Sequence, residues 1–191
     1  MNSATDTKLK RMGIFTLAQA EALGIKQPGL SRLVQKGLIK RVRRGVYLHP
    51  KAHVSVNSIE FQIACVKFGP QSAVGGMSAL FHYNLVEQVP NQTWVIVPPK
   101  MRTRERHYRL MRTKSNLEVG IITQNGYRIA SVDRTLIEAL KFASKIGERT
   151  ALRAIRMAVR QKLTSEAKLG KMAKELGLNS VLQRYFEAIV Q

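Results

Sequence analysis

Residues 15–47 constrain the fold of this chain more than any other segment, because they combine short apolar patterns with strong turn signals. Thr16 followed by Gln19 fits a capping box at the start of a helix, and Gly24 can take the left-handed conformation that ends one. Pro28 suits the first turn of a second helix, where its missing N–H costs little. A basic hairpin follows the second helix. This order of helix, tight turn, helix and hairpin predicts a winged helix-turn-helix.

The second of these helices has an apolar side and a polar side. Leu30, Leu33 and Val34 have the i, i+3, i+4 spacing that would seat it on the first helix. Outward residues near the start of a recognition helix meet base edges in the major groove, where Arg suits guanine and Gln suits adenine. We therefore expect double-stranded DNA as the partner. The candidate base readers are Gln27, Ser31, Arg32 and Gln35, and the further candidate DNA contacts are Lys36, Lys40 and the wing residues Arg41, Arg43 and Arg44.

A second interpretation of this segment is an ordinary solvated helix, since helix-turn-helix shapes also occur in protein-binding modules. The charge of the chain favours DNA. Lys and Arg number 32 against 12 Asp and Glu, which gives a net charge of +20, and such a field favours nucleic acid or another acidic surface. Residues 1–52 carry 11 basic and 2 acidic side chains, and the remainder carries 21 and 10. The second half is therefore also expected to contact something anionic, or to tolerate its own repulsion.

Cysteine content and hydropathy indicate a reduced, cytoplasmic setting. Cys65 is the single cysteine, which excludes an internal disulfide and a thiolate zinc site. Its apolar neighbours suggest a core thiol. No apolar run approaches the roughly 20 residues of a membrane span, and the N-terminus has no hydrophobic signal region. We expect no membrane partner.

The chain is expected to be α+β and to form two domains. The first, residues 1–50, is the winged helix-turn-helix, led by a short helix in which Leu9 and Met12 pack. Residues 49–52 resemble a linker. The second domain, residues 54–191, combines a small β-sheet with a helical bundle. Its expected elements are a helix near 56–68, a glycine loop at 75–76 before another helix, strands at 93–97 and 108–112, a hairpin at 119–130 turned by Asn125-Gly126, and helices near 131–145, 148–162, 165–176 and 180–190.

Five short motifs, in this order and spacing, connect the chain to a known family. They are Arg43–Tyr47 at the end of the wing, Val74–Leu80, Leu85–Pro90, Trp94–Pro98 and Ser131–Leu136. With these motifs the chain resembles the AbiEi-type antitoxins, which are the regulator halves of bacterial toxin–antitoxin and abortive-infection (phage defence) operons. The likeness extends over nearly the whole chain. One departure is Val132-Asp133-Arg134, where the family often has Pro-Glu-Arg; it weakens the helix-start signal slightly.

The resemblance implies a DNA-binding antitoxin that represses its own transcription. In such proteins the N-terminal winged domain binds inverted repeats upstream of its own operon. The C-terminal domain is implied to counter a partner toxin of the nucleotidyltransferase-like class. We expect a monomer in solution that needs no cofactor.

Two basic clusters outside the wing are further candidate surfaces for the antitoxin role. The first is residues 98–114, and its first half is predicted to be a loop. Such a loop can lie along phosphates or dock an acidic protein, although a solvated connector would look the same. The second is a predicted helix with arginines at i, i+4, i+7 and i+11, opposite a packing side formed by Leu152, Ile155 and Val159. A partner could be DNA, RNA or an acidic toxin, but such a stripe also survives without function. The candidate residues are Arg102, Arg104 and Arg106 in the loop, and Arg149, Arg153, Arg156 and Arg160 on the helix.

The sequence gives little indication of catalysis or of a metal site. His49 and His53 are separated by Pro50, which argues against a shared helical side. Asp133 and Glu138 are five apart on one predicted helix, so their carboxylates would not converge. Asp133-Arg134 fits a helix-start charge and a structural salt-bridge partner. We therefore do not expect the protein to be an enzyme. Two alternative functions are a metal-dependent nuclease that the winged domain brings to nucleic acid, and an inhibitor that only binds protein.

Overall fold

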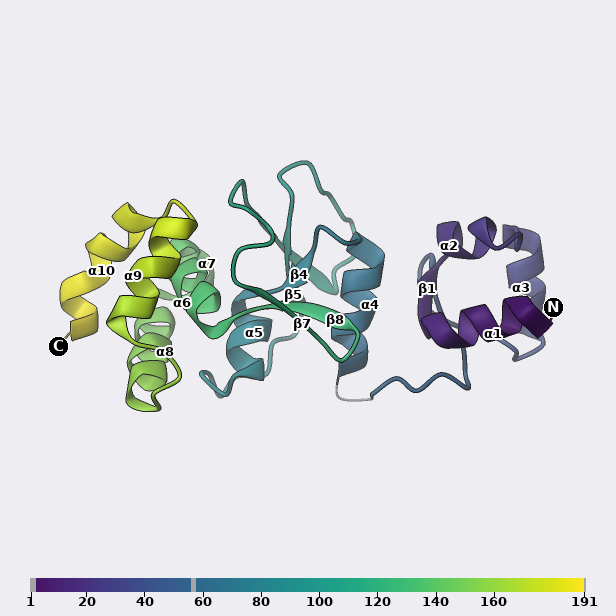
Figure 1. Ribbon diagram of the computed structural model, residues 1–191, viewed down its shortest axis with the longest axis horizontal. Helices are drawn as coiled ribbons and strands as arrows, with labels where there is room; N and C mark the ends of the chain where they lie inside the picture. Colours follow the sequence, from purple (N-terminus) through teal and green to yellow (C-terminus); the bar gives the residue numbers. More distant parts are fainter. Residues whose placement is uncertain (1–2, 56–57, 191) are drawn as a thin grey trace. The chain divides into compact units, whose positions relative to one another are not determined.

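The structure, a computed structural model, describes residues 3–55 and 58–190. The chain forms two compact units, residues 1–70 (unit 1) and residues 71–191 (unit 2). Both combine helices with a small sheet, so the expected α+β class is confirmed (Figure 1).

Unit 1 has the element order of a winged helix-turn-helix, followed by one more helix. Its sheet is antiparallel, in the order β1-β3-β2. The elements are α1 Ser3–Met12, β1 Ile14–Thr16, α2 Leu17–Ala22, α3 Gln27–Gln35, β2 Lys40–Arg43, β3 Val46–Leu48 and α4 Ile59–Phe68. Part of the helix expected near 56–68 lies outside the described residues, and α4 accounts for the rest.

The local signals at the helix ends of unit 1 are confirmed. Thr16 Oγ1 accepts a hydrogen bond from the Gln19 N–H at 3.2 Å, while Gln19 Oε1 accepts one from the Thr16 N–H at 2.8 Å, which completes the capping box. Gly24 follows α2 with φ +82°, the left-handed conformation expected of it. Pro28 lies in the first turn of α3. The turn between the two helices is therefore fixed by residues within it.

The sheet of unit 1 buries both of its sides. Phe15 and Tyr47, paired across β1 and β3, pack with Leu9, Ala20, Leu30 and Ile39 under α1, α2 and α3. The neighbouring positions on the same strands, Ile14 and Val46, contact Ile63 of α4. Because successive strand residues point to opposite sides, α4 covers the side of the sheet that α1–α3 leave open. Unit 1 is thus longer than the domain expected at residues 1–50, and that domain boundary stays a prediction.

Two expectations for the N-terminal unit were wrong. His49 is not in a linker: it is 3% exposed, its N–H donates to the Gly13 carbonyl at 2.9 Å, and its Nε2 lies 3.2 Å from Asp6 Oδ1. These contacts hold the segment after β3 against α1 and the residue that follows it. Met12 is 38% exposed and does not pack as expected, whereas Leu9, one turn earlier, is fully buried.

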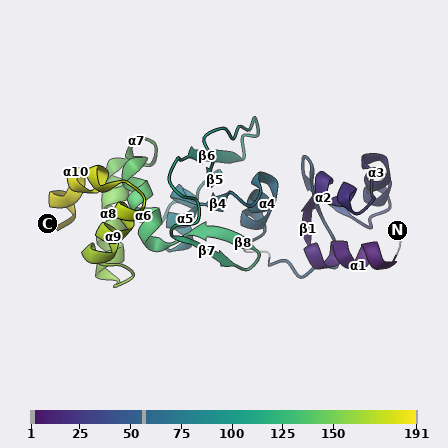
Figure 2. The same cartoon turned by 45° about the horizontal axis from the view of Figure 1, so that its top comes forward.

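Unit 2 contains a five-stranded sheet and a group of helices. Figure 2 shows α6 to α10 gathered at one end of the sheet, with α5 next to the strands. The sheet order is β6-β5-β4-β8-β7. The elements are β4 Ala73–Val74, α5 Gly76–His82, β5 Thr93–Val97, β6 Tyr108–Arg112, β7 Ile121–Gln124, β8 Tyr127–Ala130, α6 Val132–Lys141, α7 Ala143–Ile146, α8 Glu148–Arg160, α9 Glu166–Glu175 and α10 Asn179–Val190.

Two glycine-containing turns organise unit 2. Asn125 and Gly126 join β7 to β8 with φ +46° and +78°, the two positive values of the predicted type I′ turn. Gly75 and Gly76, the predicted glycine loop before a helix, are tightly packed. A Cβ on Gly75 would lie 2.5 Å from Ile96 Cγ1, and one on Gly76 would lie 2.6 Å from the Trp94 ring. Glycine is therefore required there by close packing.

A buried ion pair lies on α6. Ser131 caps this helix, since its Oγ accepts a hydrogen bond from the Arg134 N–H. Arg134 is fully buried; its Nη2 donates to Glu138 Oε1 at 3.0 Å, and its Nη1 donates to the carbonyls of Asn116 (2.8 Å) and Val119. Arg134 is thus the structural ion-pair residue that the sequence suggested, with Glu138 one turn later as its partner.

Candidate nucleic-acid interface

The packing of α3 against unit 1 leaves the polar side of this helix exposed to solvent. Leu30 is fully buried, and Leu33 and Val34 are half-buried against the core of α1, α2 and the sheet. The opposite side of the helix is consequently left to solvent. The five candidate residues of this helix and its C-terminal end are all exposed: Gln27, Ser31, Arg32, Gln35 and Lys36.

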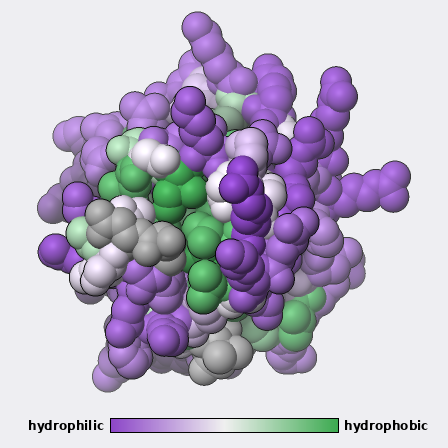
Figure 3. All heavy atoms as spheres, turned by 90° about the vertical axis from the view of Figure 1, so that its right-hand side faces the viewer, coloured by the Kyte–Doolittle hydropathy of each residue, from purple (hydrophilic) through white to green (hydrophobic). Residues whose placement is uncertain are grey.

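An open groove runs along α3 and the turn before it. Ile25 and Leu33 contribute apolar side chains to its lining, and Lys26, Arg32 and Lys36 contribute cations. Figure 3 shows a surface of unit 1 on which apolar side chains gather among mostly hydrophilic ones. A base edge with a methyl group and a neighbouring phosphate would match this mixture. The remaining lining residues are Gly24, Pro28 and Gly29.

Lys26 also lines this groove, although the sequence pattern did not single it out. It is the N-cap of α3, and its ammonium group cannot accept a hydrogen bond from the first turn. The N–H groups of the first turn are therefore left without a side-chain cap. Such groups can bind an anion, and the helix dipole strengthens that binding. The sequence could have indicated Lys26 by its position directly before Gln27-Pro28, because the start of a helix is a common phosphate-binding position.

The wing carries three exposed cations. Lys40 and Arg41 lie on β2, and Arg44 lies in the turn to β3 beside Gly45, which has φ +72°. The pairing of β2 with β3 shifts between Arg41 and Arg43, so the strand is irregular there. These side chains can contact a phosphate backbone without rearrangement of unit 1.

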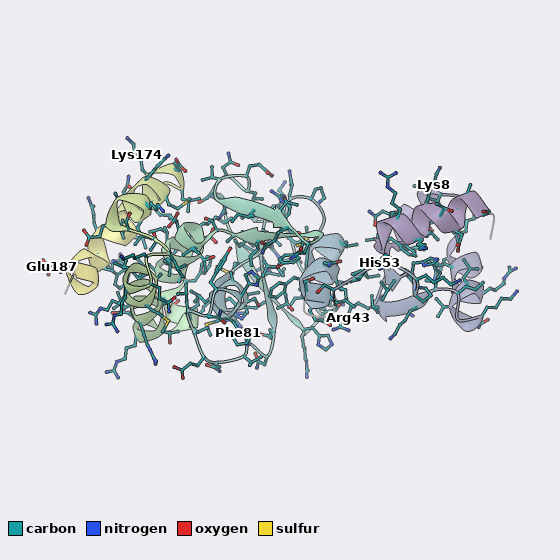
Figure 4. All side chains as sticks on the ribbon, turned by 60° about the horizontal axis from the view of Figure 1, so that its bottom comes forward. Lys8, Arg43, His53, Phe81, Lys174 and Glu187 are labelled. Atoms are coloured by element: carbon teal, nitrogen blue, oxygen red, sulfur yellow. The ribbon has the colours of Figure 1, made fainter. Side chains whose placement is uncertain are left out.

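Arg43, labelled in Figure 4, differs from its neighbours on the wing. Its Nη2 donates to both carboxylate oxygens of Glu60 on α4 at 2.8 Å, and its Nη1 donates to the Val42 carbonyl at 3.0 Å. Its side chain is 29% exposed, against 49% for Glu60. The charge of Arg43 is thus already compensated within unit 1, which the wing pattern alone did not reveal.

The basic loop of unit 2 is partly folded onto itself. Arg102, Arg104 and Arg106 are exposed, but Arg102 Nη1 donates to the carbonyls of Pro99 (2.6 Å) and Met101 (2.9 Å). The loop leads into β6, which lies at an edge of the sheet. Arg104 and Arg106 are therefore its more accessible candidate cations.

The arginine stripe on α8 is present as a continuous exposed row. Its four members, Arg149, Arg153, Arg156 and Arg160, are all exposed. The packing side differs from the expectation, because small residues form most of its buried centre: Ala151, Ala154 and Ala158, together with Ile155. The expected Leu152 and Val159 are only half-buried at its margins. Small side chains let α8 approach its neighbours closely, which leaves the longer arginines on the outer side.

The carboxylates of unit 2 that could have marked an active site are separately engaged. Asp133 accepts a hydrogen bond from Thr164 Oγ1, while Glu138 pairs with Arg134. Burial raises the pKa of Glu138 above its ordinary value, against the opposing effect of Arg134. In the described part of the chain, no three His, Cys, Asp or Glu side chains are grouped so that they could hold a metal ion. None of the helices described there is long and apolar enough to cross a membrane.

Part of the chain matches a known family. Residues 6–50 match the family model described as a transcriptional regulator, AbiEi antitoxin. This confirms the resemblance for the segment with most of α1, with α2 and α3 and with the wing, and it supports a regulator or antitoxin role. The comparison with curated proteins finds no match.

Proposed function

We propose that the protein is a sequence-specific DNA-binding regulator that represses its own operon and acts as an antitoxin. The observation that carries this proposal is the exposed polar side of α3, held outward by buried Leu30 and followed by a basic wing. The family match over residues 6–50 supports the same role.

In the proposed mechanism, α3 enters the major groove of duplex DNA. Arg32 donates two hydrogen bonds to a guanine, and Gln27 or Gln35 pairs with an adenine. Lys26 and the N-terminus of α3 contact one phosphate, and Arg41 and Arg44 of the wing contact others. Two copies on an inverted repeat would cover the promoter and block access to it.

The antitoxin part of the proposal concerns unit 2. It would counter a nucleotidyltransferase-like toxin encoded in the same operon. Its exposed arginines on α8 and in the loop after β5 give it a cationic surface that suits an acidic partner. Growth of cells that express such a toxin, with and without this protein, measures the role directly.

Binding to the protein's own upstream DNA and to a scrambled duplex, followed by fluorescence anisotropy across a salt series, tests the regulator. We expect tight binding to the native duplex that persists near 0.15 M salt, and weak, salt-sensitive binding to the scramble. Arg32→Ala should remove about 1–3 kcal/mol of discrimination between them. Arg11→Ala on α1, which loses the same charge from an exposed position, should leave the discrimination unchanged.

Equal affinity for both duplexes would refute sequence-specific recognition. An equal loss of specific and non-specific affinity in Arg32→Ala would remove Arg32 as a base reader, even if the protein still represses.

A further inference from the structure

The four arginines of α8 form a row with a definite direction and length. With about 100° between successive helix residues, their side chains fall within about 60° of one another. The rise of about 1.5 Å per residue spreads them over roughly 16 Å. The buried side of the helix, centred on Ala151, Ala154 and Ala158, lies opposite. The row is therefore a straight cationic edge about three helical turns long.

Apolar side chains flank this edge and continue it into a groove. Leu152 lies on one side of the arginines and Met157 on the other, and both line the surface along α8. Past Met157, the groove extends to Met77 of α5 and to Leu85 and Val86 in the chain after that helix. Methionine is unbranched and polarizable, so Met77 and Met157 can adapt to the side chains of different partners. None of the described residues that line these two connected stretches is aromatic.

A carboxylate of this chain already contacts the row. Glu87 Oε1 accepts from Arg153 Nη2 at 2.9 Å, and Glu87 also lines the groove. The two side chains are 85% and 70% exposed, so water screens the pair and another carboxylate can replace it at little cost. The contact shows that a carboxylate reaches the arginines from the groove side.

We propose that this groove binds an acidic amphipathic helix of a partner protein. Carboxylates at i, i+4, i+7 and i+11 of that helix would meet the arginines, and adjacent apolar side chains would fill the space around Met157. Single-stranded nucleic acid fits less well, because its affinity depends on aromatic side chains on which bases stack. Identifying the partner with the toxin rests on the proposed antitoxin role; the chemistry of the groove does not.

A labelled synthetic helical peptide with that glutamate spacing and leucines beside it tests the proposal, with a peptide of scrambled order as the reference. At about 0.15 M salt we expect the full-length protein to bind the patterned peptide more tightly than the scramble. The double substitution R153Q/R156Q should weaken binding about tenfold. The matched pair K168Q/K174Q, two exposed lysines of α9 that do not line the groove, loses equal charge and should have little effect. Glu87→Gln should strengthen binding a few-fold, because it removes the competing carboxylate.

Three results would overturn the proposal: equal binding of the two peptides, equal loss in the two double variants, or tighter binding of a single-stranded oligonucleotide of the same charge through Arg153 and Arg156. The toxin-rescue assay separates this failure from failure of the proposed function. A wild-type protein that does not restore growth would refute the antitoxin role and leave the peptide result standing.

Discussion

Arg43 and Arg44 are adjacent basic residues of the wing, yet they should contribute differently to DNA binding. Arg44 is exposed, whereas Arg43 is held by both oxygens of Glu60 at 2.8 Å. Each phosphate that a protein neutralises adds about 0.9 to the slope of log affinity against log salt. Arg44→Gln should therefore reduce the magnitude of this slope by about 0.9. Arg43→Gln should change it much less, because the Arg43 charge is already compensated.

Glu60→Gln supplies the reverse perturbation. It releases Arg43 and adds one net positive charge to unit 1, so the slope should steepen by up to about 0.9. Over a fourfold rise in salt, one such contact corresponds to a change in affinity of about three- to fourfold. Fluorescence anisotropy with a scrambled duplex at four or more salt concentrations resolves these differences without a contribution from base recognition.

Stability must be followed in the same variants. The Arg43–Glu60 pair is bidentate but only partly buried, so its loss should cost about 0.5–1 kcal/mol. Unit 1 should therefore remain folded, as circular dichroism and the unfolding midpoint would show. If Arg43→Gln and Arg44→Gln flatten the slope equally in folded protein, Arg43 exchanges Glu60 for a phosphate on DNA and the reasoning is wrong.

Three further predictions concern stability. Burial raises the pKa of Glu138, so its carboxylate binds a proton more tightly in the folded state than in the unfolded state. The stability that Glu138 contributes at low pH should therefore be lost as the pH rises above 4.5, the ordinary pKa of a glutamate. Glu138→Gln should flatten this pH dependence of the melting temperature. Gly75→Ala should destabilise unit 2 by about 1–3 kcal/mol because its Cβ would overlap Ile96, whereas Gly170→Ala, in open space on α9, should stabilise it by up to about 1 kcal/mol; equal effects in urea titrations would contradict the close-packing argument. Thr16→Ala should cost about 1 kcal/mol through loss of the capping box, and an unchanged unfolding midpoint would show that the cap contributes nothing.

Features set by neighbouring residues were predictable from the sequence. The capping box at Thr16, the turn at Gly24 and the type I′ turn at Asn125-Gly126 depend on residues at most a few positions apart. The polar side of α3 follows in the same way from the spacing of Leu30, Leu33 and Val34. On α8 the exposed arginines and the buried Ile155 agree with the prediction, but alanines form the rest of the buried side in place of the expected Leu152 and Val159. Periodicity locates the two sides of a helix, but it does not reveal how closely the neighbouring helices approach.

Most of the helices, the exposed side of α3 and the high positive charge follow from local conformational preference and composition, and they could be predicted. The short strands β1 and β4 were not predicted, because three and two residues carry too little pattern. The tertiary structure decided which cations remain available to a partner. Arg43 and Glu60 are 17 residues apart, and they meet only because α4 packs on the wing sheet. Arg153 and Glu87 are 66 residues apart, and their contact places a carboxylate in the α8 groove. Such pairings follow from how the apolar sides of distant elements pack together, and no local pattern in the chain encodes them.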